Sequence, residues 1–229
     1  MDGHLERQMI DYYRARAPEY DEWFERRGRY DQGAELNRAW FDEAAAVRAA
    51  LHAIGHAADA LELAGGTGIW TAELARLADR VTVVDASTEM IAINRARVAS
   101  DRVSYVAADL FAWEPARTYD LVFFGFWLSH VPPERLDEFL ARVARATQPG
   151  GRLFLVDSRP EPTSTTADQP LPGRGATTMT RRLNDGRTYT IVKVFYEPAT
   201  LEAVLGRHGF DARAWATERY FVYASATRR

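Results

Sequence analysis

The feature that most constrains this chain is a glycine-rich stretch that follows a short apolar run. Residues 60–64 are mostly apolar and have the length of a buried strand. Gly65, Gly66 and Gly68 follow, and residues 71–77 have the pattern of a helix with Thr71 as its expected N-cap. Glycines permit positive φ and lack the Cβ that would block a ligand, and a helix N-terminus offers free backbone N–H groups. The stretch therefore predicts a strand–turn–helix unit that holds a nucleotide-like ligand.

The residues around the glycines discriminate between nucleotides. A dinucleotide fingerprint needs a third small residue where Thr71 stands, and a P-loop needs a G-K-[ST] sequence that this chain lacks. Glu62 lies inside the strand, where a carboxylate repels a pyrophosphate but suits a cationic ligand. The sequence Glu62-Leu63-Ala64-Gly65-Gly66-Thr67-Gly68 resembles motif I of the class I S-adenosylmethionine (SAM)-dependent methyltransferases, an acidic residue and one further residue before G-x-G-x-G. Ala64 stands where the first glycine is usual, and alanine disfavours positive φ.

Two further acids fit the same ligand. A second apolar run, residues 81–84, ends in Asp85, about 20 residues after the turn, where an acid binds ribose in Rossmann-like units. Capping the next helix is the alternative role, for which Ser87 is better suited. The resemblance implies that Asp85 holds both ribose hydroxyls of SAM, that Ala86 and Met90 flank the adenine, and that Asp109 and Leu110 bind its edge. It also implies cofactor contacts from Tyr20, Glu62, Ala64, Gly65, Gly66, Gly68, Trp70 and Phe126.

The order of the predicted elements indicates an α/β fold. Further strands are expected at residues 103–107, 121–124, 152–157 and 220–226, and the turn Asn184-Asp185-Gly186 predicts a hairpin between 177–183 and 188–196. The resemblance implies a Rossmann-like seven-stranded, mostly parallel sheet of order 3-2-1-4-5-7-6, with helices on both faces and this antiparallel hairpin finishing the sheet. We expect an N-terminal helical lid at residues 1–33 and a methyltransferase domain at residues 34–229.

Composition counts against several other kinds of partner. The net charge of −3 gives no basic footprint for nucleic acid. The chain has no cysteine, which excludes thiolate metal sites and disulfides and fits the cytoplasm. Asp157 alone does not make the acidic cluster of a metal-dependent enzyme, so we predict no metal. No apolar run approaches the roughly 18 residues of a membrane span, so no membrane association is expected.

Methyl transfer from a sulfonium is an in-line displacement in which the protein aligns the reactants and excludes water. His130 follows the predicted strand 121–124, where the active sites of the family face the methyl group, and imidazole titrates near neutral pH. It is the candidate base, with a structural role as the alternative. Residues 12–21 resemble the N-terminal lid of small-molecule methyltransferases. The candidates for lid and acceptor contacts are Tyr12, Tyr13, Arg16, Trp23 and Trp127.

Three arginines flank the predicted hairpin turn, Arg181, Arg182 and Arg187. They could hold a carboxylate or phosphate, but we expect them to be solvated.

The sequence thus predicts a SAM-dependent methyltransferase that acts on a small organic acceptor, as a monomer or homodimer. The [DN]-P-P-[YF] motif of amino-methylating nucleic-acid enzymes is absent, because Val131 precedes the two prolines and Glu134 follows them. Two alternatives stay open. One is a non-catalytic SAM- or nucleotide-binding protein of the same fold, and the other is an NAD-dependent oxidoreductase, which Glu62 and the missing third glycine disfavour.

Overall fold

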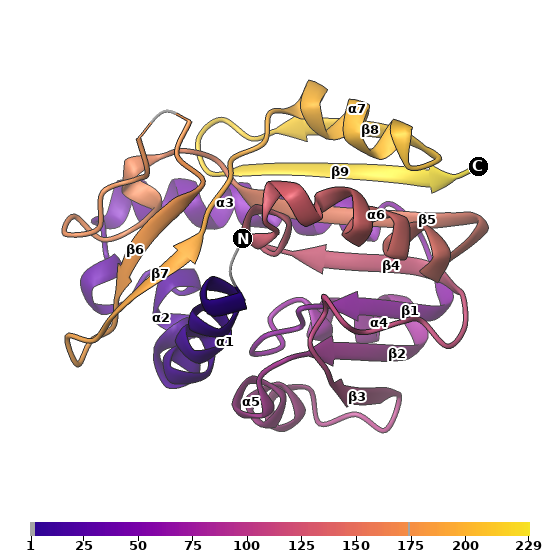
Figure 1. The fold of residues 1–229 in the computed structure, drawn as a ribbon, viewed down its shortest axis with the longest axis horizontal. Coiled ribbons are helices and arrows are strands. Elements are labelled where there is room, and N and C mark those ends of the chain that lie inside the picture. The colour runs from indigo at the N-terminus through magenta and orange to yellow at the C-terminus, as the bar shows by residue number, and fades with distance from the viewer. Residues whose placement is uncertain (1–2, 174) are drawn as a thin grey trace.

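The chain folds around one seven-stranded mixed sheet. A computed structural model describes residues 3–173 and 175–229. The strands stand in the order β3-β2-β1-β4-β5-β9-β8, and β9 runs antiparallel to both of its neighbours (Figure 1). Their bounds are β1 Ala57–Leu63, β2 Ala78–Asp85, β3 Val103–Ala107, β4 Tyr119–Gly125, β5 Thr147–Ser158, β8 Phe210–Ala216 and β9 Phe221–Arg228. The predicted fold class and strand order are confirmed, with β9 and β8 as the strands numbered 7 and 6 in the predicted order.

Helices cover both faces of this sheet. Helices α3 (Ala34–His52) and α4 (Thr71–Leu77) lie on one face, and α6 (Leu136–Ala146) and α7 (Pro198–Arg207) lie on the other (Figure 1). Helix α5 (Thr88–Val98) connects β2 to β3. The central strands are apolar on both sides: Phe123 belongs to the α3 side of the core and Phe124 to the α6 side. Such two-sided burial is typical of parallel strands under crossover helices. Within the described residues, no helix is long and apolar enough to cross a membrane.

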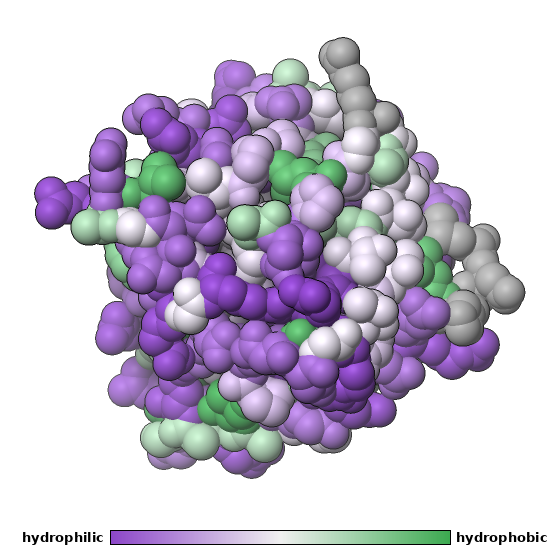
Figure 2. Space-filling model, turned by 90° about the vertical axis from the view of Figure 1, so that its left-hand side faces the viewer, coloured by the Kyte–Doolittle hydropathy of each residue, from purple (hydrophilic) through white to green (hydrophobic). Residues whose placement is uncertain are grey.

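The N-terminal segment and the segment between β5 and α7 gather at the carboxyl ends of the parallel strands (Figure 1). The N-terminal part forms α1 (Gly3–Arg16), η1 (Ala17–Glu19), α2 (Tyr20–Phe24) and η2 (Gly28–Tyr30). Strands β6 (Thr178–Arg182) and β7 (Thr188–Val192) pack beside α1. The short helices η3 (Leu128–His130), η4 (Pro133–Arg135) and η5 (Pro162–Ser164) complete the elements. The outer face on this side is mostly hydrophilic, with hydrophobic residues in small separate groups (Figure 2).

The predicted hairpin forms, but it does not finish the sheet. β6 and β7 pair with each other as a separate two-stranded sheet. Their apolar face, which includes Met179 and Ile191, is buried toward the same core as Met9 and Tyr12 of α1. The strand that finishes the sheet, on the far side of β9 from β5, is β8. The sequence analysis missed β8 because its alternate positions carry alanine, a residue depleted in strands.

Candidate active site

The glycine turn has the positive φ angles that its glycines permit, and Ala64 adopts one as well. Gly66 and Gly68 have φ of 52° and 90°, and Ala64 also has a positive φ, 57°. A Cβ on Gly65 would lie 2.3 Å from Cγ1 of Val83, so only glycine fits there. A Cβ on Gly66, by contrast, would meet nothing within 4 Å, so the turn presents bare backbone to open space at the carboxyl end of β1.

Glu62 lies directly beneath the turn and is 2% exposed. The hydroxyl of Thr71 donates to Glu62 Oε2 at 2.5 Å and accepts from Asn94 Nδ2 at 2.7 Å. The prediction that Thr71 caps α4 is therefore wrong, because its side chain is committed to the carboxyl; the N-cap is Trp70, without a side-chain bond. Burial raises the pKa of Glu62 to about 8.

Asp85 closes the other side of the turn. Its carboxylate accepts from the backbone N–H of Gly66 at 2.9 Å and of Ser87 at 2.8 Å. Ser87 itself caps α5 by accepting from the N–H of Met90, as predicted. Burial raises the pKa of Asp85.

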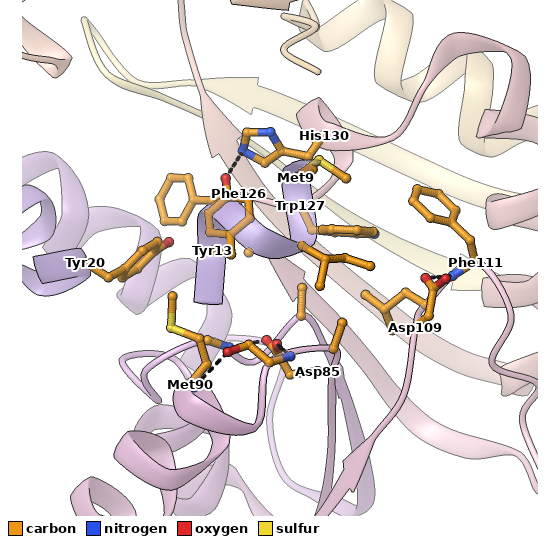
Figure 3. A pocket seen from close by; sticks show the side chains of 17 residues that line it. Met9, Tyr13, Tyr20, Asp85, Met90, Asp109, Phe111, Phe126, Trp127 and His130 are labelled. Atoms are coloured by element: carbon orange, nitrogen blue, oxygen red, sulfur yellow. Dashed lines mark hydrogen bonds between the residues drawn. The ribbon is translucent and has the colours of Figure 1, made fainter. Parts of the chain in front are cut away.

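A cavity of about 700 Å³, its open mouth included, lies between this turn and α1 (Figure 3). Asp85 and Met90 lie at one end of it, and Tyr13 and His130 lie at another (Figure 3). It is lined by nine of the predicted cofactor residues, Tyr20, Ala64, Gly66, Asp85, Ala86, Met90, Asp109, Leu110 and Phe126, and by the lid candidates Tyr13 and Trp127. The structure adds Met9, Ile10 and Phe111, which the sequence analysis did not single out.

The other predicted cofactor residues lie beside this cavity. Glu62, Gly65 and Trp70 line a smaller neighbouring cavity of about 330 Å³, which also shares Ala64, Gly66 and Phe126 with the first. Trp70 Nε1 is buried there and has no hydrogen-bond partner among the described residues. Gly68 lines neither cavity and packs against Asn94.

A further cavity of about 510 Å³ adjoins the first and shares Tyr13, Tyr20, Phe126 and His130 with it. Two arginines line it, Arg16 from α1 and Arg181 from β6, and we call it the arginine cavity. Arg16 donates to the hydroxyl of Tyr12 at 2.8 Å, and Arg181 donates to that of Thr165 at 2.7 Å. The Nε atoms of both arginines are buried and unpartnered within the described part of the chain.

The expectation that all three hairpin arginines are solvated is wrong for one of them. Arg182 and Arg187 are exposed and pair with Asp168 and Asp185. Arg181 points inward, because successive residues of a strand face opposite sides, and burial lowers its pKa.

Lys193, which the sequence analysis missed, is a third cation at this cavity. Its ammonium donates to Ser129 Oγ at 2.8 Å and lies 3.5 Å from Asp157 Oδ1. Burial lowers the pKa of Lys193 to about 8. No motif marks the residue, since it lies just beyond β7 and reaches the site only because the hairpin docks on η3.

His130 is held from both of its ring nitrogens. Nδ1 lies 2.7 Å from the carbonyl oxygen of Val192, and Nε2 lies 2.7 Å from the hydroxyl of Tyr13. Burial and the charge of Lys193 hold the pKa of His130 well below its usual range, and burial raises that of Tyr13. The histidine is therefore neutral at pH 7.

The remaining lid candidates have different positions. Trp23 lines the arginine cavity and donates to the carbonyl of Ser164 at 2.9 Å. Tyr12 is buried behind the cavities, where it holds Arg16. Among the described residues, no group of three His, Asp or Glu side chains could hold a metal ion.

Comparison with known proteins agrees with the SAM site that the sequence analysis predicted. A family model described as a methyltransferase domain matches residues 60–151. The ubiquinone/menaquinone biosynthesis C-methyltransferase UbiE of Psychromonas ingrahamii is 34% identical over 105 residues, which is 42% of this chain and only 41% of that relative. UbiE of Escherichia coli K12 is 30% identical over 66% of each chain.

A similarity over the whole chain comes from two solved structures of DhpI. The DhpI–SAM–HEP complex superposes with a TM-score of 0.81 at 38% identity and covers 99% of both chains. The DhpI–SAH complex superposes with a TM-score of 0.79 at 37% identity. With the glycine turn, Asp85 and the strand order in place, this chain belongs to the class I SAM-dependent methyltransferases that act on small molecules.

Proposed function

We propose that this protein transfers a methyl group from SAM to a small acceptor that carries an anionic group. The observation that carries the proposal is the pairing of two adjoining cavities, one between the glycine turn and α1 and one lined by two arginines whose Nε atoms are buried. Four residues line both, so ligands in the two cavities would lie next to the same side chains.

The residues of the first cavity and of its smaller neighbour fit SAM. A Cβ on Gly66 would meet nothing within 4 Å, and Trp70 Nε1 has no partner among the described residues, so the turn leaves both space and a donor for a ligand. Asp85 would hold the ribose hydroxyls, Asp109 the adenine, and Glu62 with Trp70 the charged end of the methionine moiety. When bound, SAM supplies an electrophilic methyl group.

The second cavity favours an anion. Arg16, Arg181 and Lys193 bring three cations to it, whereas Asp157, behind Lys193, is the acid that pairs with one of them. Buried charges without partners are costly, and each of the arginines keeps an unpartnered Nε. A guanidinium presents its donors as a fork that matches carboxylates and phosphates. The likeness to DhpI, solved together with SAM and HEP, supports a small acceptor bound beside SAM.

The same proposal assigns the remaining roles. His130 is the base on which the acceptor's proton ends, and Tyr13, Arg16, Trp23 and Trp127 contact or enclose the acceptor. Residues 1–33, of which 1–2 lie outside the described residues, act as a lid on the domain of residues 34–229. The protein works in the cytoplasm as a monomer or homodimer.

Calorimetry with S-adenosylhomocysteine, run beside NAD, tests the cofactor. We expect micromolar binding of S-adenosylhomocysteine that Asp85→Ala abolishes and Asp79→Ala, an exposed acid on the same strand, leaves unchanged. Binding of NAD alone would contradict the proposal.

Methyl transfer from labelled SAM to matched carboxylate, phosphate and neutral compounds tests the acceptor. Arg181→Met should raise the KM of an anionic acceptor about 10–100-fold, the worth of one or two charge-assisted hydrogen bonds. Its exposed neighbour gives the control, Arg182→Met, which should change KM less than threefold. Equal turnover of neutral and anionic compounds would count against the anionic acceptor.

A further inference from the structure

His130 has no free nitrogen to offer an acceptor. A carbonyl oxygen only accepts, so the 2.7 Å contact with Val192 places the ring proton on Nδ1. In a neutral imidazole Nε2 is then the acceptor, and the contact at 2.7 Å means that the hydroxyl of Tyr13 donates to it. Both nitrogens are thereby occupied, and His130 is only 5% exposed.

Tyr13 is the member of the Tyr13–His130 pair that can still bond to an acceptor. It lines both the cofactor cavity and the arginine cavity, and in Figure 3 its ring rises from α1 with the hydroxyl directed at His130. Its ring packs edge-on against Tyr12 and His130, which fixes the orientation of the hydroxyl. A hydroxyl that donates one hydrogen bond keeps lone pairs with which to accept another.

We propose that Tyr13 is the catalytic residue that touches the acceptor and that it relays the acceptor's proton to His130. This inference rests on the proposed function, with an acceptor whose attacking oxygen or nitrogen carries a proton. As that atom forms its bond to the methyl carbon, the carbon–sulfur bond of SAM breaks and its electron pair stays on sulfur. The acceptor's proton passes to the oxygen of Tyr13, and the proton of Tyr13 passes to Nε2 of His130.

The charges around His130 fit a relay that operates only when an acceptor is bound. The groups that face it are Arg16 and Tyr12 from α1, Arg181 from β6, and Lys193 beyond β7 with its partner Asp157 from β5. This surplus of cations opposes an imidazolium. An anionic acceptor on the arginines offsets it, so the product state with a protonated His130 becomes accessible.

Steady-state kinetics of Tyr13→Phe decides whether the hydroxyl acts. We expect kcat to fall at least about 100-fold, the usual worth of a positioned proton-transfer group, with the KM of the acceptor changed less than threefold. Tyr13→Phe combined with His130→Asn should lose little more than either alone, because the two groups act in series. Tyr189→Phe removes another hydroxyl from β7, which packs beside α1, and should leave kcat unchanged. S-adenosylhomocysteine should bind every variant equally.

A purely blocking role of the Tyr13 hydroxyl predicts a different kinetic result for Tyr13→Phe. If its hydroxyl only blocks Nε2, Tyr13→Phe would keep or gain activity, and the relay would be overturned; a rise in KM at constant kcat would overturn it as well. Nitrogen-15 NMR of His130 gives a readout without turnover: the relay requires the Nδ1–H tautomer and a shift of Nε2 in Tyr13→Phe, and an Nε2–H tautomer would refute it. An inactive wild-type protein that passes this NMR test would count against the proposed function, not against the hydrogen bond on which the relay depends.

Discussion

Ala64 holds a backbone conformation that a side chain disfavours. Its φ of 57° lies in the left-handed region, where a Cβ crowds the backbone, and where the family motif has glycine. Its N–H still donates to the carbonyl of Val84 at 2.8 Å, so the sheet holds the strained residue in place. Strain that persists next to a ligand site is stored by the surrounding structure.

Ala64→Gly should therefore stabilise the protein by about 0.5–1 kcal/mol, the relief of left-handed strain less the greater chain entropy of glycine. Thermal or urea denaturation with its midpoint measures this. Ala75→Gly, within α4, is the control of opposite sign and should destabilise by about 1 kcal/mol. A loss of stability in Ala64→Gly would show that the strain is absent.

Glu62 makes stability depend on pH. Its pKa is near 8 in the folded protein against 4.5 ordinarily, so between these values the unfolded chain has released a proton that the folded chain retains. The free energy of unfolding attributable to Glu62 then falls as pH rises through this window. Glu62→Gln keeps an acceptor for Thr71 without this cost and should exceed the wild type in stability by on the order of 3 kcal/mol at pH 8, and by little at pH 4.5.

Denaturation of both proteins from pH 4.5 to 8.5, without ligand, measures that difference. Glu89→Gln, a partly exposed acid at the start of α5, is the control and should show no such trend. A constant difference across the range would mean that Glu62 titrates normally.

At the level of elements, local sequence accounts for the cofactor half and tertiary docking for the acceptor half. Asp85 and the capping by Ser87 follow from one strand–turn–helix unit, which is why they could be predicted. Arg181 and Lys193 become site residues only because the hairpin leaves the main sheet and packs on α1 and η3. The pairing of β6 with β7 is local, but the partner on which that hairpin packs is not encoded in its turn.

For the whole molecule, the cover of the site is built from the N-terminal helices α1 and α2 and from the hairpin β6–β7, which are far apart in the sequence. The tip of the hairpin bonds to the N-terminal helices through Asn184, whose N–H and side chain donate to Glu19 and Glu22 at 2.9 Å each. Asp21 fastens the same helices to the glycine turn, since it accepts from Thr67 at 2.6 Å and pairs with Arg97. In the lid role proposed for the N-terminal segment, this cover opens to admit the acceptor while the sheet stays folded.

Asp21→Ala should therefore loosen the cover alone. We expect amides of α1 and α2 to exchange about tenfold faster than in the wild type, while those of β1 and β4 are unchanged, and S-adenosylhomocysteine to bind several-fold more weakly because the turn loses its contact with α2. Asp11→Ala, which removes an exposed acid of α1 that pairs with Arg14, is the matched control. Faster exchange throughout the sheet would mean that Asp21 supports the whole fold, and unchanged exchange in α1 and α2 would mean that the cover is held elsewhere. Faster exchange confined to α1 and α2, together with weaker binding of S-adenosylhomocysteine, would establish that the segment predicted as a lid opens as a unit and that its opening weakens the cofactor site at the glycine turn.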